Sequence, residues 1–178
     1  MNFHFTGEQL ADFERNIRRE WVMTNGLGGY AGGSVIGASC RTHQGYLIAS
    51  LHPPVERYLL LKTTTERFVQ NGVCHNLETS QHAGEPLSAE TVVNGRELPE
   101  GYRRADTVNV AADFVPRRPL YAKGQRYLTD FDYDGTVTFR YRAGSLTVRK
   151  ELALVQGENM TAIGYEIANS GEDAEFTV

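Results

Sequence analysis

The chain has 178 residues, with 18 Lys and Arg against 22 Asp and Glu, a formal net charge of −4 and 40% hydrophobic residues. One domain with a buried core is expected at this length. No apolar run approaches the roughly 20 residues of a membrane span, and no basic stripe is present that would neutralise nucleic-acid phosphates. The sequence therefore predicts neither a membrane nor a nucleic acid as partner.

The first six residues contain neither the basic nor the apolar segment of a secretory signal, so we expect a cytoplasmic protein. Cys40 and Cys74 are too few for a disulfide framework. We expect both to be reduced and buried.

A short N-terminal helix is the first predicted element. Thr6-Gly7-Glu8-Gln9 has the sequence of a capping box, and Leu10, Phe13 and Ile17 are spaced as one helical face through about Arg19.

Short strands follow the helix, at residues 35–36, 46–49 and 58–61. Asn71-Gly72 predicts a tight hairpin between two further strands. Residues 80–112 show little periodicity and are expected to form long connecting loops.

The C-terminal third alternates apolar and polar residues over 137–141, 146–154 and 161–167, and again from 174, with Lys150 interrupting the second series. Many short strands and one short helix predict a mainly β protein, an antiparallel β-sandwich over residues 1–178. Because the chain stops inside a strand pattern, we expect it to be the N-terminal part of something longer.

Glycines are concentrated between residues 26 and 45, where Gly26-x-Gly28-x-x-Ala31 matches the relaxed dinucleotide-binding fingerprint. Residues 20–25 are a poor strand, residues 30–35 are a poor helix, and no acidic residue follows about 20 positions later. Nucleotide binding is therefore not predicted. The consecutive Gly28 and Gly29 predict a positive φ or a close backbone approach.

A longer motif surrounds these glycines, and further blocks follow it along the chain. The motif and blocks are Glu20-Trp21-Val22-Met23-Thr24-Asn25-Gly26-Leu27-Gly28-Gly29-Tyr30-Ala31-Gly32-Gly33, Arg41, Gly45-Tyr46-Leu47-Ile48, Pro53-Pro54-Val55-x-Arg57, Leu59-Leu60-Leu61-Lys62, Pro99-x-Gly101-Tyr102, Gly157-Glu158-Asn159 and Tyr165. In these motifs, and over essentially its whole length, the chain resembles the N-terminal domain of bacterial and archaeal glycogen debranching enzymes of the amylo-α-1,6-glucosidase family.

The resemblance implies a large, mutarotase-like supersandwich, which in the family precedes an (α/α)6 barrel that contains the glucosidase chemistry. This chain would be the non-catalytic domain, supporting or bordering the α-glucan site of that barrel. It implies no catalytic residue, cofactor or metal of the chain's own, and no 1,6-glucosidase activity for the chain alone.

Six residues are expected to bind substrate or face the barrel, and three glycines to be structural. The six are Trp21, Asn25, Tyr30, Arg41, His43 and Gln44, and the glycines are Gly26, Gly28 and Gly29. Aromatic faces hold pyranose rings, and neighbouring Asn and Arg groups bind the hydroxyls. The alternative for Trp21, the only tryptophan, is a core position.

One block departs from the family pattern. The family has Asn-Thr-Arg-Lys/Arg-Tyr-His-Gly-Leu-Leu where this chain has Ser39-Cys40-Arg41-Thr42-His43-Gln44-Gly45-Tyr46-Leu47. Arg41 and Gly45 match, and His43 and Gln44 are expected as substitute hydrogen-bonding groups. Residues 25–33 and Arg41 are expected on the face that docks the barrel, with an exposed apolar patch or self-association near Tyr30.

Two other chemistries have partial motifs. Asp130, Asp132 and Asp134 alternate, so neighbours lie ~6.5–7 Å apart along an extended strand, close to the separation of glycosidase carboxylates. They precede an Asp-Gly turn, where carboxylates face water, and catalysis is not predicted. Asp-x-Asp-x-Asp-Gly also opens like a calcium loop, but Tyr141 stands at position 12, where a Glu is needed. The five histidines have no metal-ligand spacing.

Two rival functions stay open. One is a free-standing carbohydrate-binding or regulatory module whose sugar site is the glycine segment itself. The other is an epimerase-like sandwich enzyme, for which the histidines would have to converge in a cleft.

Overall fold

The computed structural model describes residues 2–53, 56–79 and 123–178. Its strands pair antiparallel throughout these ranges and build a sandwich-like arrangement of three sheets. The predicted fold class, mainly β and antiparallel, is confirmed. The loops expected over residues 80–112, and the Pro99-x-Gly101-Tyr102 block, lie outside the described residues.

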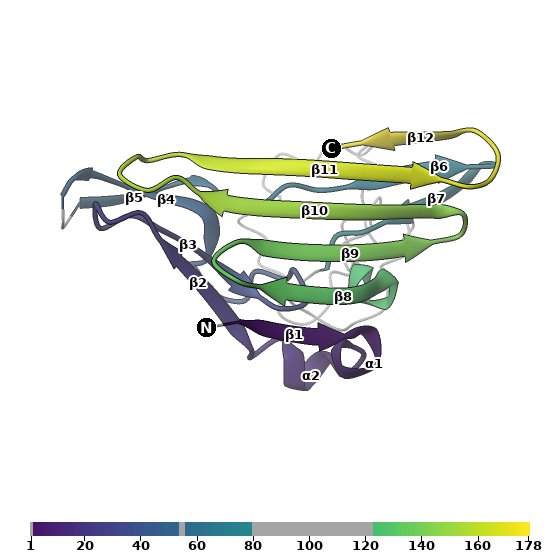
Figure 1. The fold of residues 1–178 in the computed structure, drawn as a ribbon, viewed down its shortest axis with the longest axis horizontal. Coiled ribbons are helices and arrows are strands. Elements are labelled where there is room, and N and C mark those ends of the chain that lie inside the picture. Colours follow the sequence, from purple (N-terminus) through teal and green to yellow (C-terminus); the bar gives the residue numbers. More distant parts are fainter. Residues whose placement is uncertain (1, 54–55, 80–122) are drawn as a thin grey trace, which may run out of the picture.

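A five-stranded sheet forms one layer and faces the viewer in Figure 1, in the order β1-β8-β9-β10-β11. Its strands are β1 (Phe3–Thr6), β8 (Leu128–Tyr133), β9 (Val137–Ala143), β10 (Leu146–Leu154) and β11 (Thr161–Asn169). A 3₁₀ turn at Gly124–Tyr127 leads into β8.

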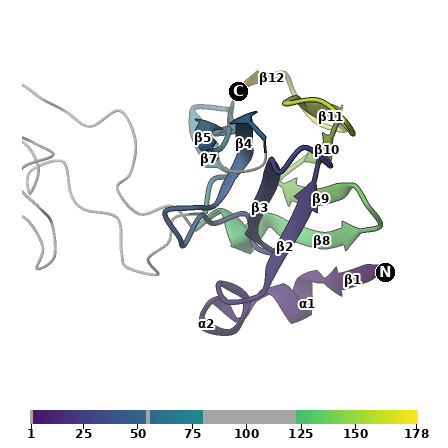
Figure 2. The same cartoon turned by 90° about the vertical axis from the view of Figure 1, so that its left-hand side faces the viewer.

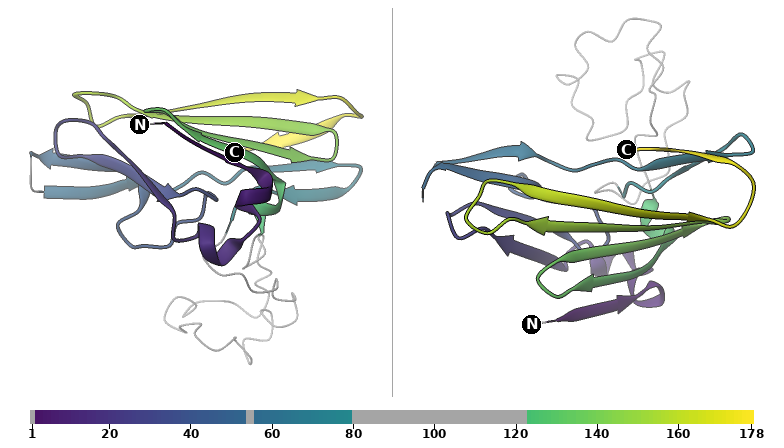
Figure 3. Two further views of the ribbon diagram at one scale, coloured as in Figure 1. Left: turned by 60° about the horizontal axis from the view of Figure 1, so that its bottom comes forward. Right: turned by 45° about the horizontal axis from the view of Figure 1, so that its top comes forward.

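Two smaller sheets form the layer behind it (Figures 1 and 3). The first has the order β2-β3-β4-β5, which Figure 2 brings to the front, and the second has the order β12-β6-β7. Their strands are β2 (Glu20–Thr24), β3 (Tyr30–Ser34), β4 (Gly45–His52), β5 (Glu56–Leu61), β6 (Arg67–Gln70), β7 (Val73–Asn76) and β12 (Ala174–Thr177).

Apolar side chains from both layers meet in one core. On β9 the apolar residues Val137, Phe139, Tyr141 and Ala143 point inward and are buried, as the alternation predicts, because one face of a strand faces the core. Core residues from the two layers include Trp21, Met23, Phe68, Phe131, Phe139, Val148 and Leu152.

Lys150 continues the inward series of β10 and does not interrupt it, which corrects the sequence analysis. Lys150 is 1% exposed, and its Nζ donates to Glu66 Oε1 at 2.6 Å and to Tyr46 Oη at 3.1 Å. Tyr165 Oη also donates to Glu66 Oε1, at 2.6 Å. Burial alone would lower the pKa of Lys150, but Tyr46 and Glu66 outweigh it and raise this pKa. An ion pair therefore links the two layers inside the core.

The predicted hairpin at Asn71-Gly72 is confirmed. It joins β6 to β7, with Gln70 opposite Val73, and its two turn residues have φ of 52° and 74°. Positive φ at both central residues is the geometry of a type I′ turn, which matches the twist of the strands.

The N-terminal helix is present as two single turns, α1 (Gly7–Leu10) and α2 (Phe13–Asn16). Gln9 Oε1 accepts from the Thr6 backbone N–H at 3.0 Å, as expected for a capping box. The helix is split because Asp12 caps α2, accepting from the Arg15 N–H at 3.0 Å.

Three local expectations are wrong. Residues 20–24 form a true strand, since Trp21 and Met23 point inward while Val22 is exposed. Val35 and Ile36 lie in the buried turn after β3. The cysteines are not both buried, because Cys40 is partly exposed and Cys74 is exposed on β7, an edge strand.

Candidate functional site

The glycine-rich segment forms the turn between β2 and β3, and Asn25 organises it. Asn25 is fully buried, and its Oδ1 accepts from the backbone N–H groups of Leu27 and Gly29, both at 3.0 Å. Its Nδ2 donates to the Glu158 carbonyl oxygen at 2.8 Å and to Asn159 Oδ1 at 3.1 Å. All the hydrogen-bonding capacity of this amide is directed inward, so Asn25 positions the loop and has no group left for a ligand.

The glycines of this loop are required by its shape. Gly26 and Gly28 have φ of +79° and +92°, where a side chain would be strained. Gly29 allows close approach, because a Cβ there would lie 2.7 Å from Asn25 Nδ2 and 2.9 Å from the Ile48 carbonyl oxygen. The expectation for the consecutive glycines is met at Gly28 by the positive φ and at Gly29 by the close approach.

Asn159 joins a third segment to the loop. Its Oδ1 accepts from the Ser50 N–H at 3.0 Å, and its Nδ2 donates to the Ser50 carbonyl oxygen at 2.8 Å. The Gly157 N–H donates to the Asn25 carbonyl oxygen at 2.7 Å. Motif segments more than 100 residues apart in sequence therefore form one hydrogen-bonded unit.

Tyr30 lies at the start of β3, on the face that β3, β4 and β5 present together. The register pairs Tyr30 with Ile48 and Ile48 with Leu59, so these side chains share one face. The Arg57 guanidinium lies over the Tyr30 ring, 5.9 Å from its centroid, and Arg57 Nε donates to the Gly28 carbonyl oxygen at 2.7 Å. Arg57 thus fixes both the ring and the loop.

Tyr30 also reaches the segment that precedes β4. Its hydroxyl donates to the His43 carbonyl oxygen at 2.8 Å, so the two predicted site residues are in direct contact. His43 itself is exposed. Tyr30 therefore connects the glycine loop with the segment around Arg41.

Gln44 organises that second segment. Its Oε1 accepts from the backbone N–H groups of Cys40 and Arg41 at 2.7 and 3.1 Å, and its buried Nε2 has no hydrogen-bond partner. Lys62 Nζ donates to the carbonyl oxygens of Arg41 and Gln44 at 3.0 and 2.7 Å. Partial burial lowers the pKa of Lys62, although Cys40 opposes this. The arrangement holds the Arg41 side chain outward, 69% exposed and paired with Glu20 at 2.6 Å.

Trp21 takes the other of its two expected positions, in the core. It is 5% exposed, and its Nε1 donates to the Ser34 carbonyl oxygen at 3.1 Å. Its ring packs against Tyr46, with centroids 6.4 Å apart. No exposed ring face is left to hold a sugar.

The structure thus links Tyr30 to the segment that contains Arg41, His43 and Gln44. Asn25 holds the glycine loop separately, at the opposite end of β2 from Glu20 and its partner Arg41, and Trp21 lies in the core. Three further residues, Arg57, Lys62 and Asn159, had no predicted role, although all three lie within the motif blocks of the family resemblance. Their positions in those blocks are the signal that would have found them.

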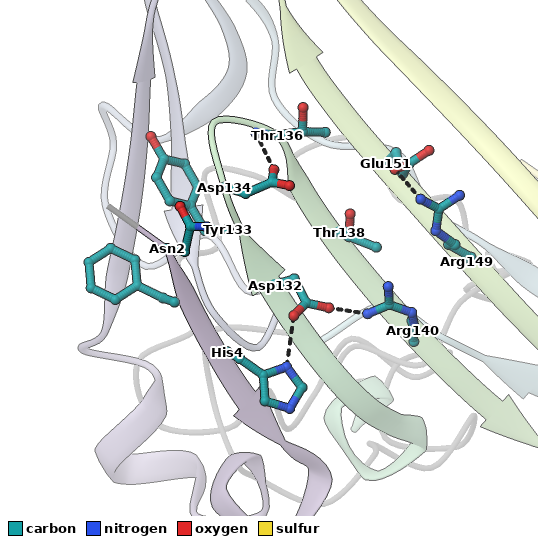
Figure 4. A pocket seen from close by; sticks show the side chains of 11 residues that line it. Asn2, His4, Asp132, Tyr133, Asp134, Thr136, Thr138, Arg140, Arg149 and Glu151 are labelled. Atoms are coloured by element: carbon teal, nitrogen blue, oxygen red, sulfur yellow. Dashed lines mark hydrogen bonds and ion pairs between the residues drawn. The ribbon is translucent and has the colours of Figure 1, made fainter.

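The alternative chemistries find little geometric support. Asp132 accepts from His4 Nδ1 at 2.7 Å and is ion-paired with Arg140 (Figure 4). Partial burial alone would raise the pKa of Asp132, but the bonds from His4 and Arg140 and the Arg140 charge lower it, whereas a general acid needs a raised pKa. The fingerprint glycines lead from strand β2 into strand β3, where a dinucleotide site requires a helix.

Three of the four histidines in the described ranges have separate partners. His4 binds Asp132, His52 Nδ1 binds Glu56 at 2.6 Å, and His75 stacks on Phe68 with centroids 4.4 Å apart. Within residues 2–53, 56–79 and 123–178, no group of three His, Cys, Asp or Glu side chains is placed to hold a metal. His82 lies outside those ranges.

Among the residues that the structure describes, no helix has the length and apolar character needed to cross a membrane.

The fold and this site define a β-sandwich domain with a glycine-rich loop whose conformation is fixed by the hydrogen bonds of the buried Asn25. A family model described as "Glycogen debranching enzyme N terminal" matches residues 19–95 and 100–178. The chain therefore belongs to the family of glycogen debranching enzyme N-terminal domains, and the predicted family is confirmed. Neither the curated proteins nor the solved structures contain a match to the chain.

Proposed function

We propose that this chain is the non-catalytic N-terminal domain of a glycogen debranching enzyme and acts in the cytoplasm. The face of β3, β4 and β5 that contains Tyr30, Ile48 and Leu59, called the Tyr30 face, docks a C-terminal (α/α)6 glucosidase barrel and borders the α-glucan site of that barrel. The observation that supports this best is the rigid presentation of Tyr30, which is held from both sides by Arg57 and the His43 carbonyl oxygen.

Exposed apolar side chains on the strands next to β3 support docking of another domain. Leu59, which the register places on the face of Tyr30, is 45% exposed. Elsewhere on β5 and at the end of β4, Tyr58 is 48%, Leu60 is 56% and Leu51 is 50% exposed. β5 is the edge strand of its sheet among the described residues, and exposed apolar side chains along an edge strand are typical of an interaction surface.

The polar groups around Tyr30 support a glucan at the border of that surface. Arg41 is exposed and lies beside the buried Gln44, and Arg57 presents its guanidinium next to an aromatic ring. Guanidinium groups donate to sugar hydroxyls, while a tyrosine ring offers an apolar surface to the C–H face of a pyranose.

Kinetics of the full-length parent enzyme test the proposal. We expect Tyr30→Ala and Arg41→Ala to lower kcat/KM for a branched dextrin, whereas Arg67→Ala, an exposed arginine on β6, leaves it unchanged. Unchanged kcat and KM in both test variants, with unchanged stability of the assembled protein, would eliminate the proposal.

The chain by itself is proposed to be inactive, because Asp132 is held between His4 and Arg140 as an ion-pair partner, and both lower its pKa, which disfavours proton donation. Glucose release from a limit dextrin should stay at the buffer background. Release above background that disappears in Asp132→Asn would place catalysis in this domain.

A further inference from the structure

The outer face of the five-stranded sheet contains a groove that is separate from the Tyr30 face. A pocket of about 440 Å³ lies over β1, β8, β9 and β10, and a second of about 270 Å³ adjoins it over β8 to β11. Arg140 and Arg149 line both pockets, so the two lie side by side on this face, and together they are called the groove. Five strands span about 19 Å at ~4.8 Å per step, a length that suits a chain-like ligand.

The groove contains charges of both signs, with carboxylates in excess. Five carboxylates and three guanidinium groups line it, together with His4. Asp132 pairs with Arg140 and His4, while Arg149 pairs with Glu151 and with Glu166. Carboxylates only accept hydrogen bonds and guanidinium groups only donate them. The groove therefore suits a neutral ligand whose groups do both, such as a polyhydroxylated sugar, and not a polyanion.

One feature of this face opposes stability. The β9–β10 register places Arg140 directly opposite Arg149, and like charges in that position destabilise a sheet. The pair is compensated only at its outer sides, by Asp132 and by Glu151 and Glu166. Thr138, which is only 5% exposed, lies beside them on the groove floor (Figure 4).

An aromatic pair closes one end of the groove. Phe3 is 45% exposed, and its ring centroid lies 6.0 Å from that of Tyr133. The Tyr133 hydroxyl donates to the Val22 carbonyl oxygen at 3.1 Å, which fixes the ring where Figure 4 shows it beside Asp134. Exposed aromatic rings beside paired hydrogen-bonding groups are the components with which proteins hold sugar rings.

We propose that this groove is a second glucan-binding site, which holds a neutral α-glucan chain on the face of the domain formed by β1, β8, β9 and β10. The choice of an α-glucan rests on the proposed function, whereas the preference for a neutral polyhydroxylated ligand rests on the groove itself. The site would tether the domain to the polymer at a place separate from the Tyr30 face.

Calorimetric titration of the 178-residue chain with maltoheptaose, together with gel retardation in soluble glycogen, tests the proposal. We expect Arg149→Gln and Phe3→Ala to weaken binding roughly tenfold or more, because each removes a direct contact to the sugar. Arg67→Gln, an exposed arginine on β6 outside the groove, should bind like the unmodified chain. Glu151→Gln keeps the size of the side chain and removes its charge, so it reports on the groove even where another variant fails to fold.

Three outcomes would overturn the second site. These are no binding of either glucan by the folded chain, equal binding by all the groove variants, and loss of binding only in Tyr30→Ala. The last outcome would leave the proposed function standing and assign the sugar to the Tyr30 face. Conversely, groove-dependent binding together with unchanged kinetics in Tyr30→Ala would keep the second site and remove the proposed function.

Discussion

Replacing Asn25 with alanine should remove the hydrogen bonds that hold the glycine loop and should destabilise the whole domain. The substitution removes four hydrogen bonds of 2.8 to 3.1 Å from a fully buried side chain. Each contributes a net ~1 kcal/mol, and backbone N–H groups left unpaired add to the loss. Partial rehydration of the loop limits the total to about 3 kcal/mol, a large fraction of the ~5–15 kcal/mol that stabilises a typical domain.

Urea unfolding of the chain, followed by circular dichroism, measures this loss. Asn2→Ala, at an exposed asparagine, is the matched control and should stay within about 0.5 kcal/mol of the unmodified chain. Asn25→Asp should fall between the two, since a carboxylate can still accept from Leu27 and Gly29 but cannot donate to Glu158 or Asn159. A loss below about 1 kcal/mol for Asn25→Ala would refute the view that this side chain organises the loop.

Three further predictions concern the core, the glycine loop and the groove. Lys150→Met should lower the free energy of unfolding by about 3–5 kcal/mol, because it leaves the buried Glu66 carboxylate without its partner. Adding Glu66→Leu should recover much of this loss, since it removes the unpaired charge, and no recovery in a double-mutant cycle would contradict the prediction. Gly29→Ala should cost about 1–3 kcal/mol by overpacking, whereas Gly164→Ala, where a Cβ meets nothing within 4 Å, should be nearly neutral; equal thermal shifts would argue against the close approach. The lowered pKa of Asp132 stabilises the fold above the unfolded pKa of ~3.9, and this contribution disappears as the pH falls through the lower folded value. Asp132→Asn should therefore flatten the dependence of stability on pH below about pH 4, and an unchanged slope would show that its ion pairs contribute nothing.

Local patterns predicted those parts of the fold that depend on neighbours in sequence. The alternation over β9, β10 and β11 was visible because each strand follows the last through a short turn. β1 was not predicted, although Phe3-His4-Phe5-Thr6 alternates apolar and polar residues, because four residues are too short a pattern to establish a strand. Its partner β8 lies 124 to 130 positions away, as in Phe3 opposite Tyr133, so the pairing cannot be derived from the local sequence.

Lys150 shows the same limit in the core. A pattern of apolar and polar residues treats a lysine as an interruption, yet a partner 84 residues away allows this one to be buried. The identity of that partner, Glu66, depends on how the two layers pack and cannot be derived from either strand by itself.

The candidate site was predicted in its parts but not in its connections. The glycines predicted a specialised loop because residues with side chains rarely adopt the positive φ found at Gly26 and Gly28. The inward position of Trp21 depends on the face of β2 that meets the core, and the role of Arg57 depends on the register from β3 to β5. Both are properties of the assembled sheets.

Hydrogen–deuterium exchange tests the docking role of the Tyr30 face most directly, by comparing the full-length parent enzyme with the 178-residue chain. If the proposed barrel covers this face, peptides covering residues 25–33, 39–45 and 56–62 should exchange more slowly in the full-length protein. Peptides of β8 and β9 should exchange alike in both proteins, because the proposal leaves the groove uncovered. Protection confined to β8 and β9, or no protection of the Tyr30 face, would contradict the proposed docking of the barrel.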